Sequence, residues 1–419
     1  MTACRYLTLN KRPRPLTLAN RLWRIPKGIF ACAITLVMLV SQVHASGTHT
    51  SETFSWHGFV SQGYVDTSAN NYLGDSEDGS LDFHEAGINA AWEASSELLL
   101  SGQLLYRRAG DTNPKGTRID YAILDWRVFD DMASGAGLRV GRLKNPYGFY
   151  SETRDVAATR PGVLLPEGVY SDYQRELVHS IDSMGFYSYF NFDDGTVTLD
   201  ANYGQPILHD DTVKALLNGV TTQGKLNNER ALVSRVIYEE STGTWRLGIS
   251  NSQFSADFEP GAGEPFQSSD VKFNQSLISG EYNWQDWQFV AEYFWRSINY
   301  NEVFGSDLSY RGNGFYTQLN YRLNAQWTVY TRKEETYLDK HDKDGSKFAA
   351  DSFFTRPAYD AFSKDLVFGV RLQPTVNWTV GVEYHRIDGT FLLPFKENPS
   401  SADRKRKWEM FLLQAAYRF

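Results

Sequence analysis

The sequence predicts an all-β fold, namely a transmembrane antiparallel up-and-down β-barrel of about sixteen strands with short periplasmic turns and long extracellular loops. Three observations predict it. Apolar and polar residues alternate at period two, the connections alternate between short and long, and 15% of the residues are aromatic although mean hydropathy is only −0.44. A barrel with lipid outside and water inside explains this combination. No run of 18 apolar residues follows residue 45, which excludes a helical membrane protein.

Alternation is clearest in the last third of the chain, where one face of each segment is apolar and the other is polar or charged. In 286–298 the polar face contains Gln288, Glu292 and Arg296, and the apolar face contains Trp287, Phe289, Ala291, Tyr293 and Trp295. The segments 312–323, 326–338 and 376–387 repeat this pattern. Aromatic residues at the ends of the apolar face are typical of strands that cross two membrane interfaces.

Sixteen such segments are predicted along the chain. They are 54–65, 81–93, 97–108, 118–128, 137–145, 178–191, 196–204, 229–239, 244–252, 272–284, 286–298, 312–323, 326–338, 365–373, 376–387 and 408–419. Alternation is weaker between 118 and 145, so counts of fourteen or eighteen strands stay open. A barrel of sixteen strands is wide enough for an aqueous lumen, whereas eight strands leave an interior that side chains fill.

The predicted connections give an independent signal because tight turns and long loops alternate. Turns such as 94–96, 193–195, 240–243 and 324–325 are short, and the longest loops are 66–80, 146–177, 205–228, 253–271, 339–364 and 388–407. Short periplasmic turns and long extracellular loops produce this alternation in an up-and-down barrel. An even number of strands then places both chain ends on the periplasmic side.

Residues 1–45 have the pattern of a cleaved signal peptide, which leaves 46–419 as a single barrel domain. Seven Lys and Arg and no acidic residue precede the apolar run Ile29–Val40, and Val43 and Ala45 are small residues suited to cleavage after Ala45. The alternative, a membrane anchor, is disfavoured because twelve apolar residues span only about 18 Å of a hydrocarbon core of roughly 30 Å.

The charge and cysteine content of 46–419 restrict its partners. With seven of the 42 basic residues removed, 35 basic residues face 50 acidic ones, a formal charge of −15. This balance excludes nucleic acid and disfavours anionic lipid as a partner. Both cysteines, Cys4 and Cys32, precede residue 46, so the expected domain has no disulfide. No metal-ligand spacing, nucleophile elbow or phosphate loop occurs, and we expect no cofactor and no metal.

The last residues alternate apolar side chains up to a terminal aromatic, and the set is Phe411, Leu413, Ala415, Tyr417 and Phe419. This ending resembles the C-terminal signature by which outer-membrane barrels are recognised for insertion. The resemblance implies the outer membrane of a Gram-negative bacterium as the location, with outer-membrane lipid and the barrel-assembly machinery as partners.

The segment 146–177 follows the fifth predicted strand, and its position and length resemble the third extracellular loop of the general porins. The similarity in strand plan covers all of 46–419. It implies that 146–177 folds into the barrel and narrows the pore. The charged loop residues expected at the constriction are Glu152, Arg154, Asp155, Arg160, Glu167, Asp172 and Arg175. An ordinary surface loop with solvated charges is the alternative, although Val163, Leu164, Leu165 and Tyr170 would pack against a wall.

General porins oppose the acidic residues of this loop with basic residues on the barrel wall. Arg107 and Arg127 fall on the inward phase of their strands. For Arg142 and Lys144 the phase is ambiguous, because Leu138 and Val140 facing lipid would send both outward unless a bulge rotates them inward. These four residues are the expected pore wall. The acidic excess in the loop predicts a mild preference for cations.

The resulting functional hypothesis is a porin, a water-filled channel for passive diffusion of small polar solutes and ions, that is not an enzyme. The alternatives are a substrate-specific channel with a binding track in its lumen and, more weakly, an outer-membrane β-barrel enzyme. The small outward residues Ala86 and Ala90 are consistent with a homotrimer.

Overall fold

The computed structural model describes residues 53–111, 116–172, 179–208, 222–302, 305, 307–351 and 356–419. The predicted signal peptide lies outside these residues. None of the helices in the described part of the chain is long and apolar enough to cross a membrane.

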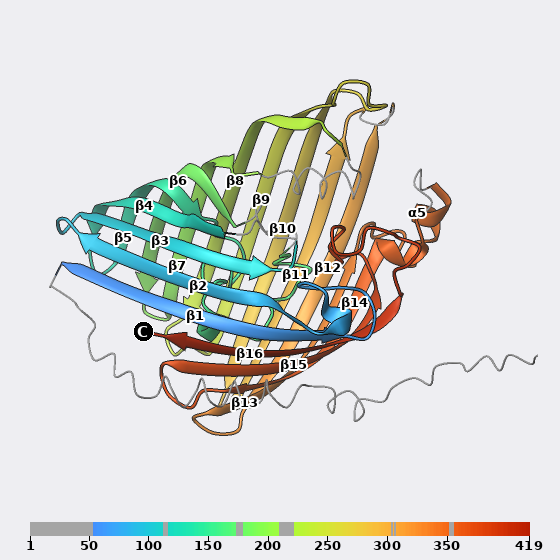
Figure 1. The fold of residues 1–419 in the computed structure, drawn as a ribbon. Coiled ribbons are helices and arrows are strands. Elements are labelled where there is room, and N and C mark those ends of the chain that lie inside the picture. Colours follow the sequence, from blue (N-terminus) through green and yellow to red (C-terminus); the bar gives the residue numbers. More distant parts are fainter. Residues whose placement is uncertain are drawn as a thin grey trace, which may run out of the picture. The chain divides into compact units, whose positions relative to one another are not determined.

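Sixteen antiparallel strands close into one barrel, with β1 hydrogen-bonded to both β2 and β16 (Figure 1). The strands are β1 Phe54–Thr67, β2 Ser80–Glu93, β3 Leu98–Ala109, β4 Gly116–Asp130, β5 Ser134–Lys144, β6 Ser180–Phe192, β7 Gly195–Pro206, β8 Lys225–Glu240, β9 Trp245–Glu259, β10 Ser269–Trp284, β11 Trp287–Tyr300, β12 Leu308–Arg322, β13 Trp327–Tyr337, β14 Phe362–Leu372, β15 Trp378–Gly389 and β16 Lys407–Arg418. The predicted fold class and the count of sixteen are therefore confirmed.

Short helices occur only in loops among the described residues. They are η1 Ser76–Asp78, η2 Ala157–Thr159, α5 Ser346–Asp351 and η3 Ala358–Ala361. The predicted alternation of connections is confirmed, since β10 and β11 are joined by two residues whereas β13 and β14 are joined by 24. In the tight β10–β11 turn Gln285 has φ 54°, a left-handed conformation that two-residue hairpin turns require.

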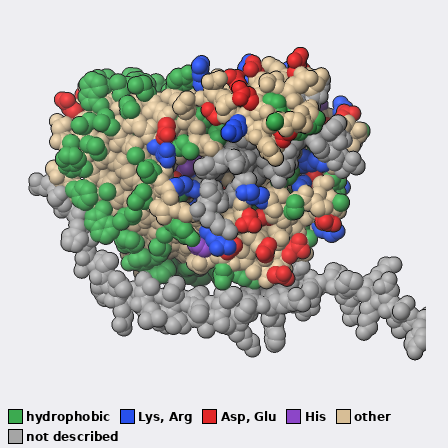
Figure 2. All heavy atoms as spheres, turned by 45° about the horizontal axis from the view of Figure 1, so that its top comes forward, with side chains coloured by type: hydrophobic (Ala, Val, Ile, Leu, Met, Phe, Trp, Pro, Cys, Tyr) green, Lys and Arg blue, Asp and Glu red, His purple; other side chains and the backbone are tan. Residues whose placement is uncertain are grey.

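Burial follows the predicted two-residue period. In β11 the outward set Trp287, Phe289, Tyr293 and Trp295 is exposed, whereas Val290, Glu292 and Arg296 point inward and are buried. Near the short turns, aromatic residues pair across strands on the outer face, with ring centroids 4.3 Å apart for Trp245–Tyr282 and 4.4 Å for Trp287–Tyr321. Figure 2 shows hydrophobic side chains over the left of the molecule and charged side chains toward the right, where the long loops lie. This is the outer surface of a membrane barrel.

Two irregularities explain the weak alternation of the early strands. The register shifts between β3 and β4 at Gln103/Leu104 and between β4 and β5 at Arg127/Phe129. Each extra residue exchanges the inward and outward phases, so a strict period-two pattern fails in this stretch.

The predicted long loop 253–271 is wrong in extent, because β9 continues to Glu259 and β10 begins at Ser269. Phe254 and Phe258 alternate inward there and pack on Val271, Phe273 and residues of β11. The inward face is therefore apolar at the loop end of these strands, and these side chains pack on one another. The prediction assumed a polar inward face and so ended the strands too early.

The chain end closes the barrel. Phe419 exchanges two backbone hydrogen bonds of 2.9 Å with Gly58 of β1. Gly58 also makes room for the Phe419 ring, since a Cβ there would lie 2.5 Å from its Cζ. The predicted set Phe411, Leu413, Ala415 and Tyr417 lies on the outward face of β16, opposite the buried Leu412 and Ala416.

Candidate functional site: a loop fixed inside the barrel

The segment that follows β5, residues 145–172, lies inside the barrel. Its apolar side chains Tyr147, Phe149, Leu165 and Tyr170 pack on inward residues of β8, β10, β11 and β12, which are Val233, Ile237, Leu277, Val290, Phe294 and Tyr316. Burial of about half a dozen large side chains provides a hydrophobic contribution of several kcal/mol to holding the loop. The loop is therefore packed against the wall and is not a solvated surface segment.

Glu292 of β11 is the first of three buried wall carboxylates that bind the loop. It accepts hydrogen bonds from the Tyr170 hydroxyl at 2.7 Å and from the Phe149 backbone N–H at 3.3 Å. Beside it, Arg296 donates to the Gly168 carbonyl at 3.1 Å. Hydrogen bonds between a charged side chain and a backbone group are stronger than hydrogen bonds between two neutral groups.

Glu383 of β15 is the second. Its two oxygens accept from the backbone N–H groups of Val163 and Leu164 at 3.0 and 3.1 Å. Arg332 of β13 donates to the Leu164 carbonyl at 3.1 Å. Gly162 allows this close approach, because a Cβ at that position would lie 2.3 Å from Glu383 Oε1. The loop backbone is thus held by side chains of the wall, in place of the ladder bonds of a strand.

Glu85 of β2 is the third, and it joins the wall to the charged residues predicted in the loop. It accepts from Arg107 Nε at 2.7 Å and from Arg160 Nη2 at 2.6 Å. Arg107 also contacts Asp172, which receives Arg154 Nη2 at 3.0 Å. All these side chains are at most 13% exposed. The ion pairs are therefore mutually neutralised and largely shielded from solvent.

A fourth contact lies where the loop leaves β5. Lys144 Nζ is 3.0 Å from Asp120 and 3.1 Å from Asp155, and His179 Nε2 lies 3.0 and 3.1 Å from the same two carboxylates. Two buried aspartates and a histidine could hold a metal ion. Here the Lys144 ammonium already occupies the position of a cation between them.

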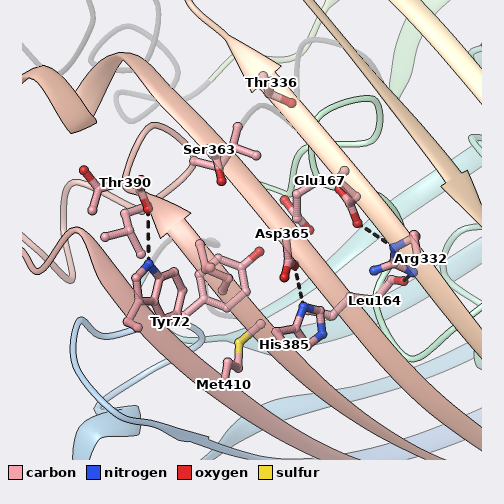
Figure 3. A pocket seen from close by; sticks show the side chains of 16 residues that line it. Tyr72, Leu164, Glu167, Arg332, Thr336, Ser363, Asp365, His385, Thr390 and Met410 are labelled. Carbon is pink, nitrogen blue, oxygen red and sulfur yellow. Dashed lines mark hydrogen bonds and ion pairs between the residues drawn. The ribbon is translucent and has the colours of Figure 1, made fainter. Parts of the chain in front are cut away.

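A small cavity separates the loop from β13–β16 (Figure 3). It encloses about 40 Å³ and includes Tyr72, Glu167, Arg332 and His385 in its lining. His385 points toward Asp365 and bridges it to Glu383, at 2.6 and 3.2 Å. This volume holds about three waters and no larger solute. Burial, together with the nearby Asp172 carboxylate, raises the pKa of Glu167 to about 8.

The opposite wall is different. On β7 the inward side chains of Thr196 and Thr198 are only half-buried, whereas Tyr330, Arg332, Glu334 and Thr336 of β13 are all buried under the loop. We call the inward faces of β11, β13 and β15 the closed side. The open side consists of Asp125, Arg139, Tyr187, Asp200 and Arg235 on β4–β8.

Charges of both signs line the open side. Arg235 Nη2 lies 2.7 Å from Glu152 of the loop and 3.0 Å from Asp200. Arg139 lies 2.9 Å from Asp125, and its guanidinium is 4.1 Å from the centre of the Tyr187 ring. Glu152 is 36% exposed, more than the other acidic side chains that the loop contributes to these ion pairs. The accessible charge of the loop is therefore concentrated at Glu152.

The predicted residues separate into groups. The structure brings Arg107, Arg154, Asp155, Arg160, Glu167 and Asp172 together as buried contacts, and it places Glu152 on the open side. Lys144 turns inward at the end of β5. Arg175 lies outside the described residues.

The expectation that Arg142 lines the pore is wrong. Arg142 pairs in register with Ala122 and bonds Asp182 at 2.9 Å, and Asp182 lies on the exposed phase of β6 with Met184 and Phe186. Gly141 has φ 127°, yet the strand keeps its phase, so Arg142 stays on the outer face. Arg127 is inward in phase but lies at the periplasmic end, where it contacts Ser96 O at 3.3 Å and Asp130 at 3.4 Å.

Sequence reasoning did not single out the residues that hold the loop or line the open side. Glu85, Glu383, Arg139, Asp200 and Arg235 all lie on the polar phase of their strands. Inward phase alone could have listed them as lumen residues. Their partners could not be read from the pattern, because the path of the loop decides which wall residue it meets.

Comparison with solved structures identifies this architecture. The structure of this chain matches that of Salmonella typhi OmpF in complex with daunomycin at 11% identity and TM-score 0.54, covering 87% of this chain and 97% of that one. The fold is that of the outer-membrane porins. Pseudomonas putida OprB matches at 10% identity and TM-score 0.53 (88% and 94% covered), and the Acinetobacter baumannii outer membrane channel DcaP at 12% and 0.51 (89% and 99%).

No protein-family model and no curated relative matches the sequence. The porin fold is thus recognised through structure, at identities near one in ten. A closed sixteen-stranded barrel with an apolar outer surface is a protein of the Gram-negative outer membrane.

Proposed function

We propose that this porin-like barrel is a water-filled channel for passive diffusion of small polar solutes and ions, with a mild preference for cations. The observation that carries the proposal is the asymmetric position of the loop, which is fixed on the closed side and leaves the more exposed charges, Arg139 of the open side and Glu152 of the loop, facing the lumen. A narrow lumen with low-dielectric walls strengthens the effect of each charge on a passing ion. Among the charges of the open side and the loop residue paired with them, Asp125, Glu152 and Asp200 outnumber Arg139 and Arg235.

Planar-bilayer recording of the refolded protein tests this proposal. We expect discrete conductance steps that increase linearly with salt, and a reversal potential in a salt gradient that corresponds to a modest cation excess. Absence of channels from correctly folded protein would refute diffusion, and a clear anion preference would refute the selectivity.

A substrate-specific channel is the second candidate, and one feature favours it. Arg139 and Arg235 alternate with Asp125, Asp200 and Glu152 around the open side, as in a track of paired charges along which a polar solute could exchange hydrogen bonds. Conductance that saturates, or that one solute blocks at micromolar concentration, would favour this candidate over general diffusion.

We further propose that the barrel works without catalysis and assembles as a homotrimer. The outer face of β2–β5 carries a shallow depression of about 410 Å³, lined by small residues that include Ala90, Gly102 and Ala122. Such a surface can accommodate the side chains of a second copy. One solved structure of this fold, OmpT of Vibrio cholerae, is described in a trimer form. Mass measurement in detergent tests the trimer, and assays for lipid and peptide hydrolysis test the lack of catalysis.

The outward set on β16 supports the proposed recognition by the barrel-assembly machinery. Phe419 contacts Trp56 and Tyr417, with ring centroids 6.0 and 6.2 Å apart, so its ring also contributes to closure. Refolding into pure lipid separates the two roles. A Phe419→Ala variant that refolds normally in vitro but accumulates unfolded in cells would support recognition.

A further inference from the structure

The outer face of β13–β16 has a basic surface, although the chain as a whole is acidic. In β13–β16 the outward phase is apolar from the short turns upward and becomes charged near the long loops. Register neighbours across the four strands form one row of Lys333, Leu366, Arg386 and Glu409, and the next row is Glu335, Lys364, Asp388 and Lys407. Because neighbouring strands are about 4.8 Å apart, each row extends over roughly 14 Å.

Two loop residues extend these rows. Lys343 lies 5.0 Å from the centre of the Tyr337 ring, and Arg406 lies 5.5 Å from that of Phe362, while Lys364 is near both rings. We call the resulting set the basic belt. Its cations are Lys333, Lys343, Lys364, Arg386, Arg406 and Lys407, and its anions are Glu335, Asp388 and Glu409.

The belt has more positive than negative charge, and its side chains are accessible. Lys333 is paired with Glu335 at 2.9 Å and Arg406 with Asp388 at 2.6 Å, yet Lys333 is 58% and Arg406 53% exposed. Arg386 and Lys407 are exposed and have no ion-pair partner within the described part of the chain. The belt therefore attracts an anion locally, although the chain as a whole is acidic.

Three other groups of charged residues on the outer face are balanced. Near the loop end of β8–β10, Lys225, Arg230 and Lys272 are matched by Asp257, Glu259 and Asp270. On β2–β3 and β5–β6 the outer charges form the pairs Asp82–Arg108 and Arg142–Asp182. The surplus of positive charge is thus specific to β13–β16 among these surfaces.

We propose that the basic belt binds the phosphate groups of an anionic glycolipid in the outer leaflet. The belt is continuous with the lipid-facing residues Leu366, Phe368, Tyr384 and Phe411 directly below it, so one molecule can place acyl chains on the apolar face and phosphates among the cations. A soluble anion would use the charges alone, whereas this arrangement fits a headgroup joined to acyl chains. This proposal departs from the expectation, drawn from overall charge, that anionic lipid is disfavoured, because it rests on a local surplus of positive charge.

The test measures binding of lipid A carrying both phosphates to the detergent-solubilised full barrel, by native mass spectrometry. The triple variant Lys333→Gln, Lys364→Gln, Arg386→Gln should bind roughly 100-fold more weakly, since each cation near such a surface contributes about fivefold. The matched control Lys225→Gln, Arg230→Gln, Lys272→Gln removes the same charge from the balanced group and should stay within about twofold of the wild type. Heat-modifiable migration in gels verifies that each barrel is folded.

Four results would overturn the proposal: wild-type affinity in the triple variant, an equal loss in the control, equal binding of dephosphorylated lipid A, or full displacement by millimolar inorganic phosphate. The last would show a site for free anions. Should the triple variant fail to fold, Arg386→Glu alone must weaken binding at least tenfold, and an unchanged affinity counts against the belt.

Discussion

The two sides of the lumen use the same residue types for opposite purposes. On the closed side Glu292, Glu383 and Arg332 are buried, and their charges are directed at the backbone of the loop. On the open side Arg139, Asp200 and Arg235 pair with each other and with Glu152, and among them only Arg235 donates to the loop backbone, at 3.2 Å from the Gly148 carbonyl. Inward phase therefore predicts that a charge faces the interior, whereas its partner decides whether it fixes the loop or stays available for the proposed contact with solute.

Loss of a closed-side carboxylate should produce the largest effect. Glu383→Ala leaves two backbone N–H groups and Arg332 without this acceptor, and removal of one partner from a buried charged contact costs about 3–5 kcal/mol. We expect the loop to detach and single-channel conductance to rise at least twofold, with noisy open states. Glu239→Ala, an exposed inward residue of β8, is the control. Quiet, wild-type conductance in Glu383→Ala would contradict the assigned role.

Gly162→Ala should act at the same point more weakly. The added Cβ would lie 2.3 Å from Glu383 Oε1, so the loop must shift by several tenths of an ångström. We expect increased current noise and a modest rise in conductance. Gly280→Ala, where the nearest atom would be 3.8 Å away, should behave as wild type in the same recordings. The idea fails if the two variants cannot be told apart.

Charge changes on the open side should alter selectivity without enlarging the pore. Glu152→Gln removes an accessible negative charge and should shift the reversal potential in a salt gradient toward anions. Arg235→Gln should shift it toward cations, by about 10 mV in either direction, and conductance should change by less than about a third. Shifts of the same sign in both variants would show that these residues are not in the ion path.

The smallest expected effect depends on pH. The pKa of Glu167 is raised to about 8, chiefly by burial, so folding of the loop favours the protonated carboxyl. The contribution of Glu167 to the stability of the folded loop is complete below the ordinary pKa of a glutamate and is lost as pH rises through about 8. Conductance measured from pH 6 to 9.5 should therefore become noisier near pH 8. Glu167→Gln should abolish this rise in current noise. If the rise persists in the variant, another titrating group causes it.

Much of the fold could be predicted because a period of two records which side of a strand meets lipid. In β11 the alternation from Trp287 to Trp295 was sufficient to separate outward from inward residues. It was insufficient for β4, where two bulges exchange the phases, and for Arg142, because the pattern did not show whether β5 keeps its phase at Gly141. The partners of the loop were beyond prediction, since the contact of Glu383 with Val163 joins residues 220 positions apart.

The central claim is that solutes pass along the open side and not along the closed side. Residues 46–419 contain no cysteine, which provides a clean background for single cysteines. The most direct measurement compares Thr198→Cys, half-buried on β7, with Val290→Cys, buried beneath the loop on β11, during exposure to a positively charged thiol reagent. We predict a stepwise loss of current in Thr198→Cys and an unchanged current in Val290→Cys. Equal modification of both positions, or modification of Val290→Cys alone, would contradict the account.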